Sequence, residues 1–353
     1  KKQINKKYNK EKKKILFVIS LMSVLLFVSE LITAQNRVSA EKSKYSQKKD
    51  TGLYFSDDPH VIACTKNRKQ VAGSPYRPLY HFSAPKERIH DPNGLCYWKG
   101  NYHLFYQYKV KKGKRTITSW GHTYSKDLLH WNDLPVAFAP TIEKACYSGQ
   151  TYVEPGRVIA AYQGVGKGMM IATATDSLLL NWEKHPANPV IPNEVSGVFS
   201  AKGNNLRRIL DNCIWKEKNG FYYALSGSYR NGRRGRKGNC IGETLIFRSK
   251  YLKKWEYLGP MYTDTVFAEP GEDMQVPNFW PIDHNKHMLL CFSHKHAGRG
   301  YVGTFDLKTA RFKADYHFRE NHGSYANASL HAPTATIDEQ GRYIGIFNTK
   351  EAS

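Results

Sequence analysis

Short apolar runs, each followed by a polar turn, recur along most of this chain. A clear example is LCYW at 95–98, a Lys-Gly-Asn turn, and then YHLFY at 102–106. Runs of this length that are rich in aromatic and β-branched residues are typical of β-strands, and the turn between them predicts an antiparallel hairpin. No long apolar stripe with helical period follows residue 40, so we expect few helices.

The hairpin pattern occurs five times. A repeat of nearly 60 residues that is built from short strands is typical of propeller blades with four strands each. We therefore predict an all-β fold, a five-bladed β-propeller that spans residues 76–353. The second strands of the later copies are residues 158–162, 221–225, 287–291 and 343–347. The copies start near Asp91, Ser148, Asp211, Pro277 and Pro333, at spacings of 57, 63, 66 and 56.

A second recurring motif, which ends in tryptophan, follows the inner hairpins. It predicts the turn before the outer strand of a blade. Its tryptophans read as structural wedges between the outer strands. The fifth repeat reaches only its second strand before Ser353, so we expect an incomplete last blade and a sequence that is cut short. The copies of the motif are SKDLLHW at 125–131, TDSLLLNW at 175–182 and SKYLKKW at 249–255.

The N-terminus has the pattern of a targeting segment. Eight lysines within residues 1–14 precede an apolar stretch at 15–32, and small residues follow up to Ala40. This order predicts a secretory signal peptide over residues 1–40, cleaved after Ala34 or Ala40. An uncleaved membrane anchor is the alternative, because about 18 residues can just span a bilayer. Either reading places the folded part outside the cytoplasm, as a secreted, periplasmic or cell-envelope protein.

Residues 41–75 are polar and charged, and we interpret them as a linker with a candidate edge strand at 53–55. The formal net charge is +23, of which residues 1–40 supply +7 and the remainder +16. A basic surface favours anionic partners such as an acidic glycan or a cell envelope. The densest basic cluster is RNGRRGRKG at 230–238, which reads as a flexible, solvated loop. No nucleic-acid motif accompanies it, so we expect no nucleic-acid partner.

The six cysteines show no C-x-x-C metal spacing, and we predict neither a metal site nor a particular disulfide. Three of them fall in predicted strands and read as small buried hydrophobic residues. These three are Cys96, Cys213 and Cys291.

The two aspartates at equivalent repeat positions carry the candidate chemistry. Asp91 and Asp211 each stand just before the innermost strand of a predicted blade, so the repeat brings two carboxylates to one mouth of the central channel. Two carboxyl groups that flank a glycosidic bond are the minimal apparatus for glycoside hydrolysis. Asp91 precedes a rigid Pro-Asn-Gly turn and is the better nucleophile candidate, whereas Asp211 is placed to stabilise charge in the transition state. From the repeat alone, each is equally a turn or capping carboxylate.

Several ordered segments resemble family 32 of the glycoside hydrolases, the family of invertases, levanases and inulinases. The resemblance covers roughly residues 78–350. It implies a five-bladed propeller and retaining hydrolysis of β-fructofuranosyl bonds without a metal or cofactor. The family usually adds a β-sandwich domain, which we expect to be missing here because the sequence reads as cut short. The segments are DPNG at 91–94, LFYQY at 104–108, WGH at 120–122 and SKDLLHWNDLP at 125–135.

The resemblance also implies roles for individual residues. Asp91 would be the nucleophile and Asp211 the transition-state stabiliser, while Gln107, Trp120 and Ser148 would contact the fructosyl unit. His90, Asn93 and Gln275 complete the candidate substrate contacts.

The chain departs from the family pattern at three places. Gln275 stands where the family has its acid/base glutamate, and an amide cannot protonate a leaving group. Glu272 is our candidate for that role, with Asp273 as the alternative. His90 replaces the usual Asn before the first aspartate, and Leu210 replaces the usual Arg before the second.

The leading hypothesis is a secreted β-fructosidase that acts on sucrose, levan or inulin. The altered sugar contacts and the basic charge leave open a hydrolase of another furanoside or of an anionic glycan. The glutamine at 275 leaves open a non-catalytic carbohydrate-binding propeller.

Overall fold

The computed structural model describes residues 57–76, 78, 81–83, 89–112, 115–193, 209–320 and 330–349. Its contacts divide the chain into units Lys1–Tyr54 and Phe55–Ser353, and every described residue belongs to the second. The predicted signal peptide or anchor and the candidate edge strand at 53–55 lie outside the described residues. In the described ranges, no helix combines the length and the apolar character that a membrane crossing requires.

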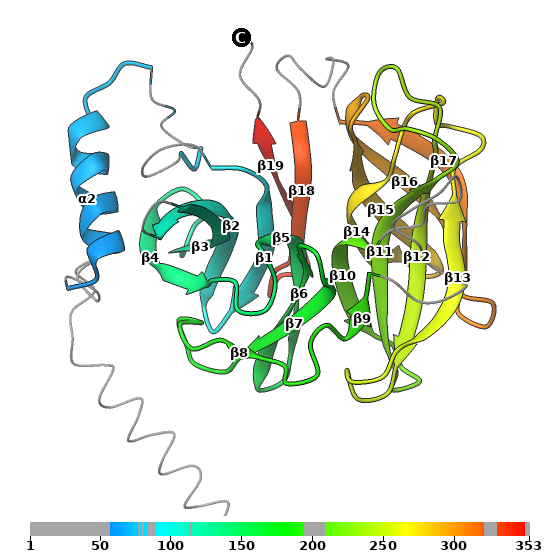
Figure 1. Ribbon diagram of the computed structural model, residues 1–353, viewed down its shortest axis with the longest axis horizontal. Helices are drawn as coiled ribbons and strands as arrows, with labels where there is room; N and C mark the ends of the chain where they lie inside the picture. The colour runs from blue at the N-terminus through cyan, green and yellow to red at the C-terminus, as the bar shows by residue number, and fades with distance from the viewer. Residues whose placement is uncertain are drawn as a thin grey trace, which may run out of the picture. The chain divides into compact units, whose positions relative to one another are not determined.

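Antiparallel sheets make up most of the described chain (Figure 1). The first sheet runs in chain order through β1 (Pro92–Trp98), β2 (Asn101–Lys112), β3 (Arg115–Ser125) and β4 (Trp131–Phe138). Another four-stranded sheet comprises β14 (Gln275–Asp283), β15 (Lys286–Ser293), β16 (Ala297–Asp306) and β17 (Arg311–Arg319). A two-stranded sheet comprises β18 (Leu330–Ile337) and β19 (Tyr343–Thr349).

The remaining sheet has nine strands and consists of two antiparallel halves. The halves join where β5 and β10 run parallel, at the pair Gly149 and Asn212. The first half comprises β5 (Cys146–Glu154), β6 (Arg157–Gly164), β7 (Gly168–Ala174), β8 (Glu183–Lys184) and β9 (Ile191–Pro192). The second half comprises β10 (Leu210–Lys216), β11 (Tyr222–Arg230), β12 (Ile241–Ser249) and β13 (Glu256–Thr263).

All five hairpins predicted from the sequence are present, as the pairs β1–β2, β5–β6, β10–β11, β14–β15 and β18–β19. The first strands of these hairpins form a ring: β1 contacts β5, β5 contacts β10, β10 contacts β14, β14 contacts β18, and β18 contacts β1. Figure 1 shows β18 and β19 between the sheet that begins with β1 and the sheet that begins with β14. A ring of inner strands with sheets radiating from it is consistent with a β-propeller.

Hydrogen bonds from three other hairpins hold the fifth hairpin in the ring. The side-chain amides of Gln150 and Asn278 both donate to the Pro333 carbonyl, at 3.1 and 3.0 Å. The Leu95 backbone N–H donates to the Thr334 hydroxyl at 2.9 Å. The ring is therefore closed by hydrogen bonds between segments more than fifty residues apart in the chain.

Each inner hairpin has a shift of register near the start of its first strand. Such bulges redirect side chains locally and often occur beside functional sites. Ser148 and Asp211 both lie within these irregular segments, at corresponding ends of β5 and β10. The shifts lie between Asn93 and Cys96, Cys146 and Gly149, Leu210 and Asn212, Gln275 and Asn278, and His331 and Thr334.

The tryptophans of the second recurring motif support the turns before the outer strands. The Trp131 indole N–H donates to the Leu128 carbonyl at 3.0 Å, and Trp255 donates to Leu252 at 3.3 Å. Both leucines have positive φ, 66° and 61°, a conformation that is costly for a leucine and needs such support. The predicted structural role is confirmed for these two tryptophans.

The linker prediction for residues 41–75 is wrong at its C-terminal end, where helix α2 (Pro59–Val71) forms. The Asp58 side chain caps this helix by accepting from the backbone N–H groups of His60 and Val61. The helix carries no apolar stripe, because among its described residues only Cys64 is buried. Its attachment is polar: the Arg68 guanidinium reaches Asp133 on β4 with contacts of 2.5 and 2.8 Å. A search for apolar periodicity therefore misses this helix.

The core lies between neighbouring sheets, in clusters of aliphatic and aromatic side chains. Cys96 belongs to one cluster, and Cys213 and Cys291 to another, all as buried free thiols. Their predicted role as small hydrophobic residues is confirmed.

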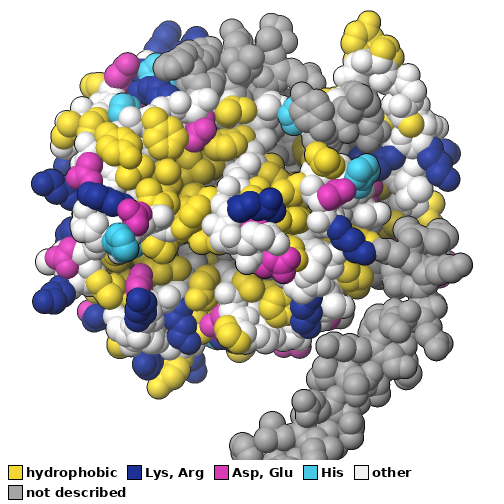
Figure 2. Space-filling model, turned by 180° about the vertical axis from the view of Figure 1, so that it is seen from behind, with side chains coloured by type: hydrophobic (Ala, Val, Ile, Leu, Met, Phe, Trp, Pro, Cys, Tyr) yellow, Lys and Arg dark blue, Asp and Glu magenta, His cyan; other side chains and the backbone are white. Residues whose placement is uncertain are grey.

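The surface charge is mixed on the face seen in Figure 2. Lys and Arg side chains there are interspersed with Asp and Glu side chains, and apolar atoms lie between them. The net positive charge of the chain is therefore not gathered into a single basic patch on this face.

Candidate active site

Asp91 directly precedes β1, one of the inner strands of the ring. Residues on β2 and β5 hold it in place. The Gln107 N–H donates to the Asp91 carbonyl at 2.9 Å, and the His90 N–H donates to the Gln107 carbonyl at 3.1 Å. The Ser148 hydroxyl donates to Asp91 Oδ2 at 2.5 Å, and the Gln107 amide donates to the same oxygen at 3.1 Å. Backbone and side-chain bonds together orient this carboxylate.

Two opposing effects act on the pKa of Asp91. Burial raises it above the ordinary value, because a charged carboxylate is poorly solvated in this position. The hydrogen bond from Ser148 and the nearby His90 and His294 act in the opposite direction. Since a nucleophilic carboxylate must be ionised, these three neighbours favour the reactive form.

Asp211 is the second residue of β10 and is only 8% exposed. Burial and the charge of Asp91 raise the pKa of Asp211 to about 7, while the Val276 backbone N–H and the Arg234 guanidinium oppose the shift. Contacts with β5 place both aspartates beside this one inner strand. The Ser148 hydroxyl bonds Asp91. The next residue, Gly149, pairs with Asn212, which directly follows Asp211. Residues 120 positions apart in the chain thus meet at one end of the inner strands.

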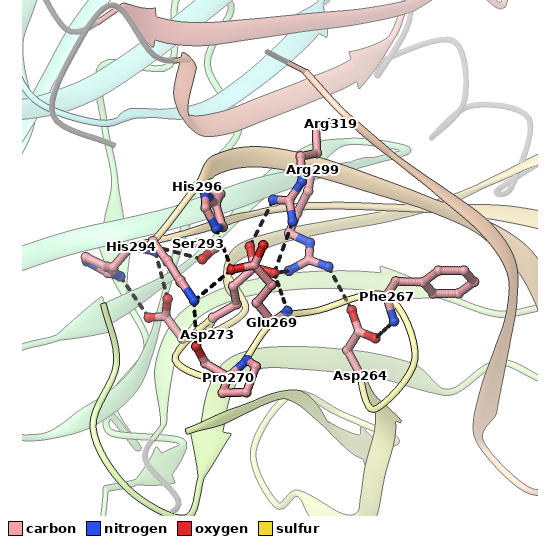
Figure 3. Close-up of polar contacts among 12 residues, drawn as sticks. Asp264, Phe267, Glu269, Pro270, Asp273, Ser293, His294, His296, Arg299 and Arg319 are labelled. Atoms are coloured by element: carbon pink, nitrogen blue, oxygen red, sulfur yellow. Dashed lines mark hydrogen bonds and ion pairs between the residues drawn. The ribbon is translucent and has the colours of Figure 1, made fainter. Parts of the chain in front are cut away.

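Glu272, the sequence-based candidate for the acid/base role, forms ion pairs with Arg299 and Arg319. Both arginines are labelled in Figure 3. Glu272 Oε2 lies 2.9 Å from Arg299 Nη1, and Glu272 Oε1 accepts from Arg319 Nη1 at 2.9 Å. The Glu269 backbone N–H donates to Oε2 at 2.9 Å. Arg299 is completely buried and also contacts Asp264, with Nη2 2.8 Å from Oδ2.

This environment does not suit a general acid. Although burial alone would raise the pKa of Glu272, the two arginines and the backbone donor more than offset it, so the pKa is lowered. A proton donor at neutral pH needs a raised pKa. The contacts therefore do not support the predicted acid/base role, because the Glu272 carboxylate is engaged with two guanidinium groups, one of them fully buried.

Asp273, the alternative candidate, contacts the side chains of His294 and Arg234. Asp273 Oδ1 accepts from the His294 backbone N–H at 2.8 Å, and Oδ2 lies 2.7 Å from His294 Nδ1. Arg234 Nη1 donates to the same Oδ2 at 3.4 Å. Because His294 acts on Asp91 and Arg234 acts on Asp211, this group belongs to the same site as the two aspartates.

The sequence missed both His294 and Arg234. His294 follows β15 without a motif around it, so only the pairing of β14 with β15 brings it to Asp273.

Arg234 lies in the basic segment 230–238 that we interpreted as a flexible, solvated loop. That interpretation is wrong for its centre, where the Gly235 N–H donates to the Gly271 carbonyl at 2.8 Å. A Cβ on Gly271 would lie 2.6 Å from the Gly235 carbonyl oxygen, so glycine allows this close approach.

Three predicted substrate contacts are buried in the protein. Trp120 is 0% exposed, packs between aromatic rings, and donates its indole N–H to the Tyr147 carbonyl at 3.0 Å. Asn93 is equally buried. Gln275 is nearly so, and its amide donates to the carbonyl of its own neighbour Met274. These side chains shape the site from within, and direct sugar contact is not supported for them.

Gln107 and Ser148 are likewise buried, and they bond to each other at 2.6 Å as well as to Asp91. Both side chains therefore orient the Asp91 carboxylate. His90 is partly exposed and influences Asp91 electrostatically. Among the predicted substrate contacts, His90 is thus the one best placed to meet a ligand.

Residues 81–349 match the sequence profile described as "Glycosyl hydrolases family 32 N-terminal domain". Curated relatives include the cell wall isozyme of beta-fructofuranosidase from Pisum sativum, which is 31% identical over 220 residues, 59% of this chain and 37% of that protein. The levanase of Bacillus subtilis is 28% identical over 256 residues, 65% of this chain and 34% of that protein. The chain thus spans little more than a third of the length of these relatives.

Solved structures agree with the profile. A GH32 beta-fructofuranosidase of Bombyx mori, solved as a mutant in complex with sucrose, superimposes with a TM-score of 0.63 at 25% identity. That match covers 85% of this chain and 64% of the insect enzyme. The fructan 1-exohydrolase IIa of Cichorium intybus, in complex with 1-kestose, has a TM-score of 0.60 at 24% identity, over 77% and 53% of the two chains.

Proposed function

Because this chain belongs to glycoside hydrolase family 32, we propose that it hydrolyses β-fructofuranosyl bonds of the sucrose, levan or inulin type. The single observation that carries the proposal is the placement of Asp91 and Asp211, two carboxyl groups from different hairpins, at one end of the inner strands and beside the same strand, β5. Ser148 bonds Asp91, and the next residue pairs with Asn212 beside Asp211. The orientation of Asp91 by Ser148 and Gln107 supports its role as nucleophile. Curated relatives that act on fructosides support the substrate class.

We further propose a retaining reaction. Asp91 attacks the anomeric carbon of the fructosyl unit as the glycosidic bond breaks, and a covalent fructosyl–enzyme ester forms. Asp211 is placed to stabilise the positive charge on the sugar ring in the transition state. Water then cleaves the ester, which releases fructose and restores the carboxylate of Asp91.

We also infer that the five hairpins are the inner halves of five propeller blades. The closed ring of β1, β5, β10, β14 and β18 supports this count. The arrangement matters for chemistry because it converts equivalent positions along the chain into neighbours around one channel.

The test uses the full-length protein with sucrose, levan and inulin, and fructose release is the readout. We expect turnover on at least one substrate and its loss in Asp91→Ala. Asp283→Asn is the matched control, because Asp283 is an exposed carboxylate at the opposite end of β14 from the site. Retention is checked by the anomeric configuration of the first product formed. Sugar binding without turnover on any substrate would instead identify a non-catalytic carbohydrate-binding protein.

We propose export for the protein, on the basis of the basic and apolar segments within residues 1–40. N-terminal sequencing of the mature protein tests this. A start after Ala34 or Ala40 supports a cleaved signal peptide, and an intact N-terminus in the membrane fraction supports an anchor.

A further inference from the structure

The reaction proposed above lacks a proton donor for the departing oxygen. Gln275 carries an amide, and the carboxylate of Glu272 is held between two arginines with a lowered pKa. Sucrose and fructans have poor, alkoxide-like leaving groups, so their release at neutral pH needs a positioned acid. Another residue near Asp91 and Asp211 must therefore supply the proton.

His294 meets the requirements of such a donor. It directly follows β15, at the same end of its hairpin as the start of β14 and thus at the end where Asp211 lies on β10. Its side chain is 26% exposed, whereas that of its partner Asp273 is 0% exposed. It lies close enough to Asp91 to influence that carboxylate electrostatically.

Asp273 sets the orientation and the tautomer of the imidazole. It accepts from the His294 backbone N–H at 2.8 Å, and its other oxygen lies 2.7 Å from Nδ1. Since an ionised carboxylate can only accept, Nδ1 must carry a hydrogen in this contact. Protonation of the ring then occurs at Nε2, the nitrogen that does not face Asp273.

We propose that His294 is the catalytic acid and base of this site and that Asp273 is its positioning residue. This inference rests on the proposed fructosidase function. The Nε2–H of the imidazolium transfers its proton to the glycosidic oxygen while the Asp91 carboxylate forms the bond to the anomeric carbon, and the alcohol leaves. The neutral imidazole then takes a proton from the water that attacks the ester, which returns Asp91 as carboxylate and His294 as imidazolium.

The charged and titratable groups around His294 come from several elements. Asp273 precedes β14 and contacts the ring, Asp91 precedes β1, and Arg234 from the loop after β11 shares the Asp273 oxygen. The arginine satisfies part of the charge of Asp273 and also influences Asp211. The His294–Asp273 pair, Asp91 and Asp211 thus form one connected electrostatic site.

The chain offers a matched control two residues away. His296 contacts the carboxylate of Glu269, with Nε2 3.1 Å from Oε2, and its side chain is 32% exposed. His296 thus lies on the same turn as His294, has a similar exposure and also contacts a carboxylate. Its partner is Glu269, whereas the partner of His294 is Asp273 (Figure 3). His296→Gln therefore controls for the loss of a partly exposed histidine on this turn, although the Glu269 side chain is 57% exposed and that of Asp273 is buried.

The experiment compares two fructosides in the full-length protein: sucrose, whose leaving group needs protonation, and 4-nitrophenyl β-fructofuranoside, whose leaving group does not. The variants are His294→Asn, which can still donate to Asp273, and His294→Gln, which places its amide near Nε2. We expect kcat/KM on sucrose to fall on the order of 10²-fold or more, with a much smaller loss on the nitrophenyl substrate. His296→Gln should match the parent on both substrates.

Asp273→Asn tests the positioning role. It should lower kcat on sucrose with little change in KM, and again spare the nitrophenyl substrate. An equal loss on both fructosides in both His294 variants, or no loss at all, would overturn the proposal while leaving the fructosidase function intact. If the parent protein turns over neither of the two fructosides, both the fructosidase function and the proposed role of His294 are overturned. Thermal unfolding of each variant shows whether it is folded, and the two His294 substitutions provide independent chances of a folded protein.

Discussion

A buried carboxyl group with a raised pKa destabilises the protein when it ionises, and Asp211 allows a direct measurement of that cost. Burial and the neighbouring Asp91 raise its pKa from 3.8 to about 7 in the native state. Asp211→Asn keeps the shape of the side chain, and its amide oxygen can still accept from the Val276 N–H. The substitution therefore removes mainly the ionisation.

The sign and size of the effect follow from proton linkage. Between about pH 4 and pH 7 the native state holds the Asp211 proton more tightly than the unfolded chain, so the free energy of unfolding falls as the pH rises through this window. A shift of about 3 pKa units at about 1.4 kcal/mol each gives an upper bound of about 4 kcal/mol above pH 7. The asparagine variant does not lose this stability. It should match the parent below pH 4 and exceed it by a few kcal/mol at pH 8.

The assay is guanidinium unfolding of parent and variant at pH 4, 6 and 8. The difference between the two proteins reports the coupled pair of Asp91 and Asp211, because the charge of one acts on the other. Asp264→Asn is the control of opposite sign: Asp264 is equally buried but pairs with Arg299, so its loss should destabilise the protein at pH 8. A variant Asp211→Asn that is less stable than the parent at pH 8, or more stable by the same amount at every pH, would refute the reasoning.

Two further substitutions test the contacts of the site. Ser148→Ala removes a hydrogen bond that lowers the pKa of Asp91, so the acidic limb of the kcat/KM profile should move to higher pH. An unmoved limb would show that this bond does not control the nucleophile. Glu272→Gln leaves Arg299 and Arg319 facing a neutral amide and should cost about 3–5 kcal/mol of unfolding free energy at pH 7. Because the pKa of Glu272 is lowered in the native state, its contribution is present above pH 4.5 and is lost as the pH falls, so the gap should narrow in acid. A fully stable Glu272→Gln protein with selective recovery on a nitrophenyl fructoside would restore Glu272 as proton donor.

The repeated strand pattern allowed the inner half of the fold to be predicted. Each of the five hairpins found in the sequence is present, and the turns that hold Trp131 and Trp255 repeat in structure as they do in sequence. Helix α2 could not be predicted in the same way, because Asp58 at its start and Arg68 near its end stabilise it through polar contacts. Such contacts leave no periodic signal in the pattern of apolar residues.

The candidate site was predictable where it depends on equivalent positions in the repeat. Asp91 and Asp211 occupy such positions, and the ring of inner strands brings them together. The ion pairs of Glu272 could not be predicted because its neighbours in space, Arg299 and Arg319, come from strands β16 and β17. No spacing between residues in the sequence predicts an ion pair of that kind.

The sequence by itself determined what is local and repeated: the strands, their turns, and which residues stand at the mouth end of each inner strand. Alternation of apolar and polar residues is sufficient for that, since burial on a sheet has a period along the chain. Only the tertiary structure decided how each acidic side chain is charged and held. Glu272 and Asp273 are adjacent in the chain, yet one faces two arginines and the other faces His294. The pKa of a carboxyl group depends on its burial and on the charges near it in space, and the order of residues along the chain gives neither.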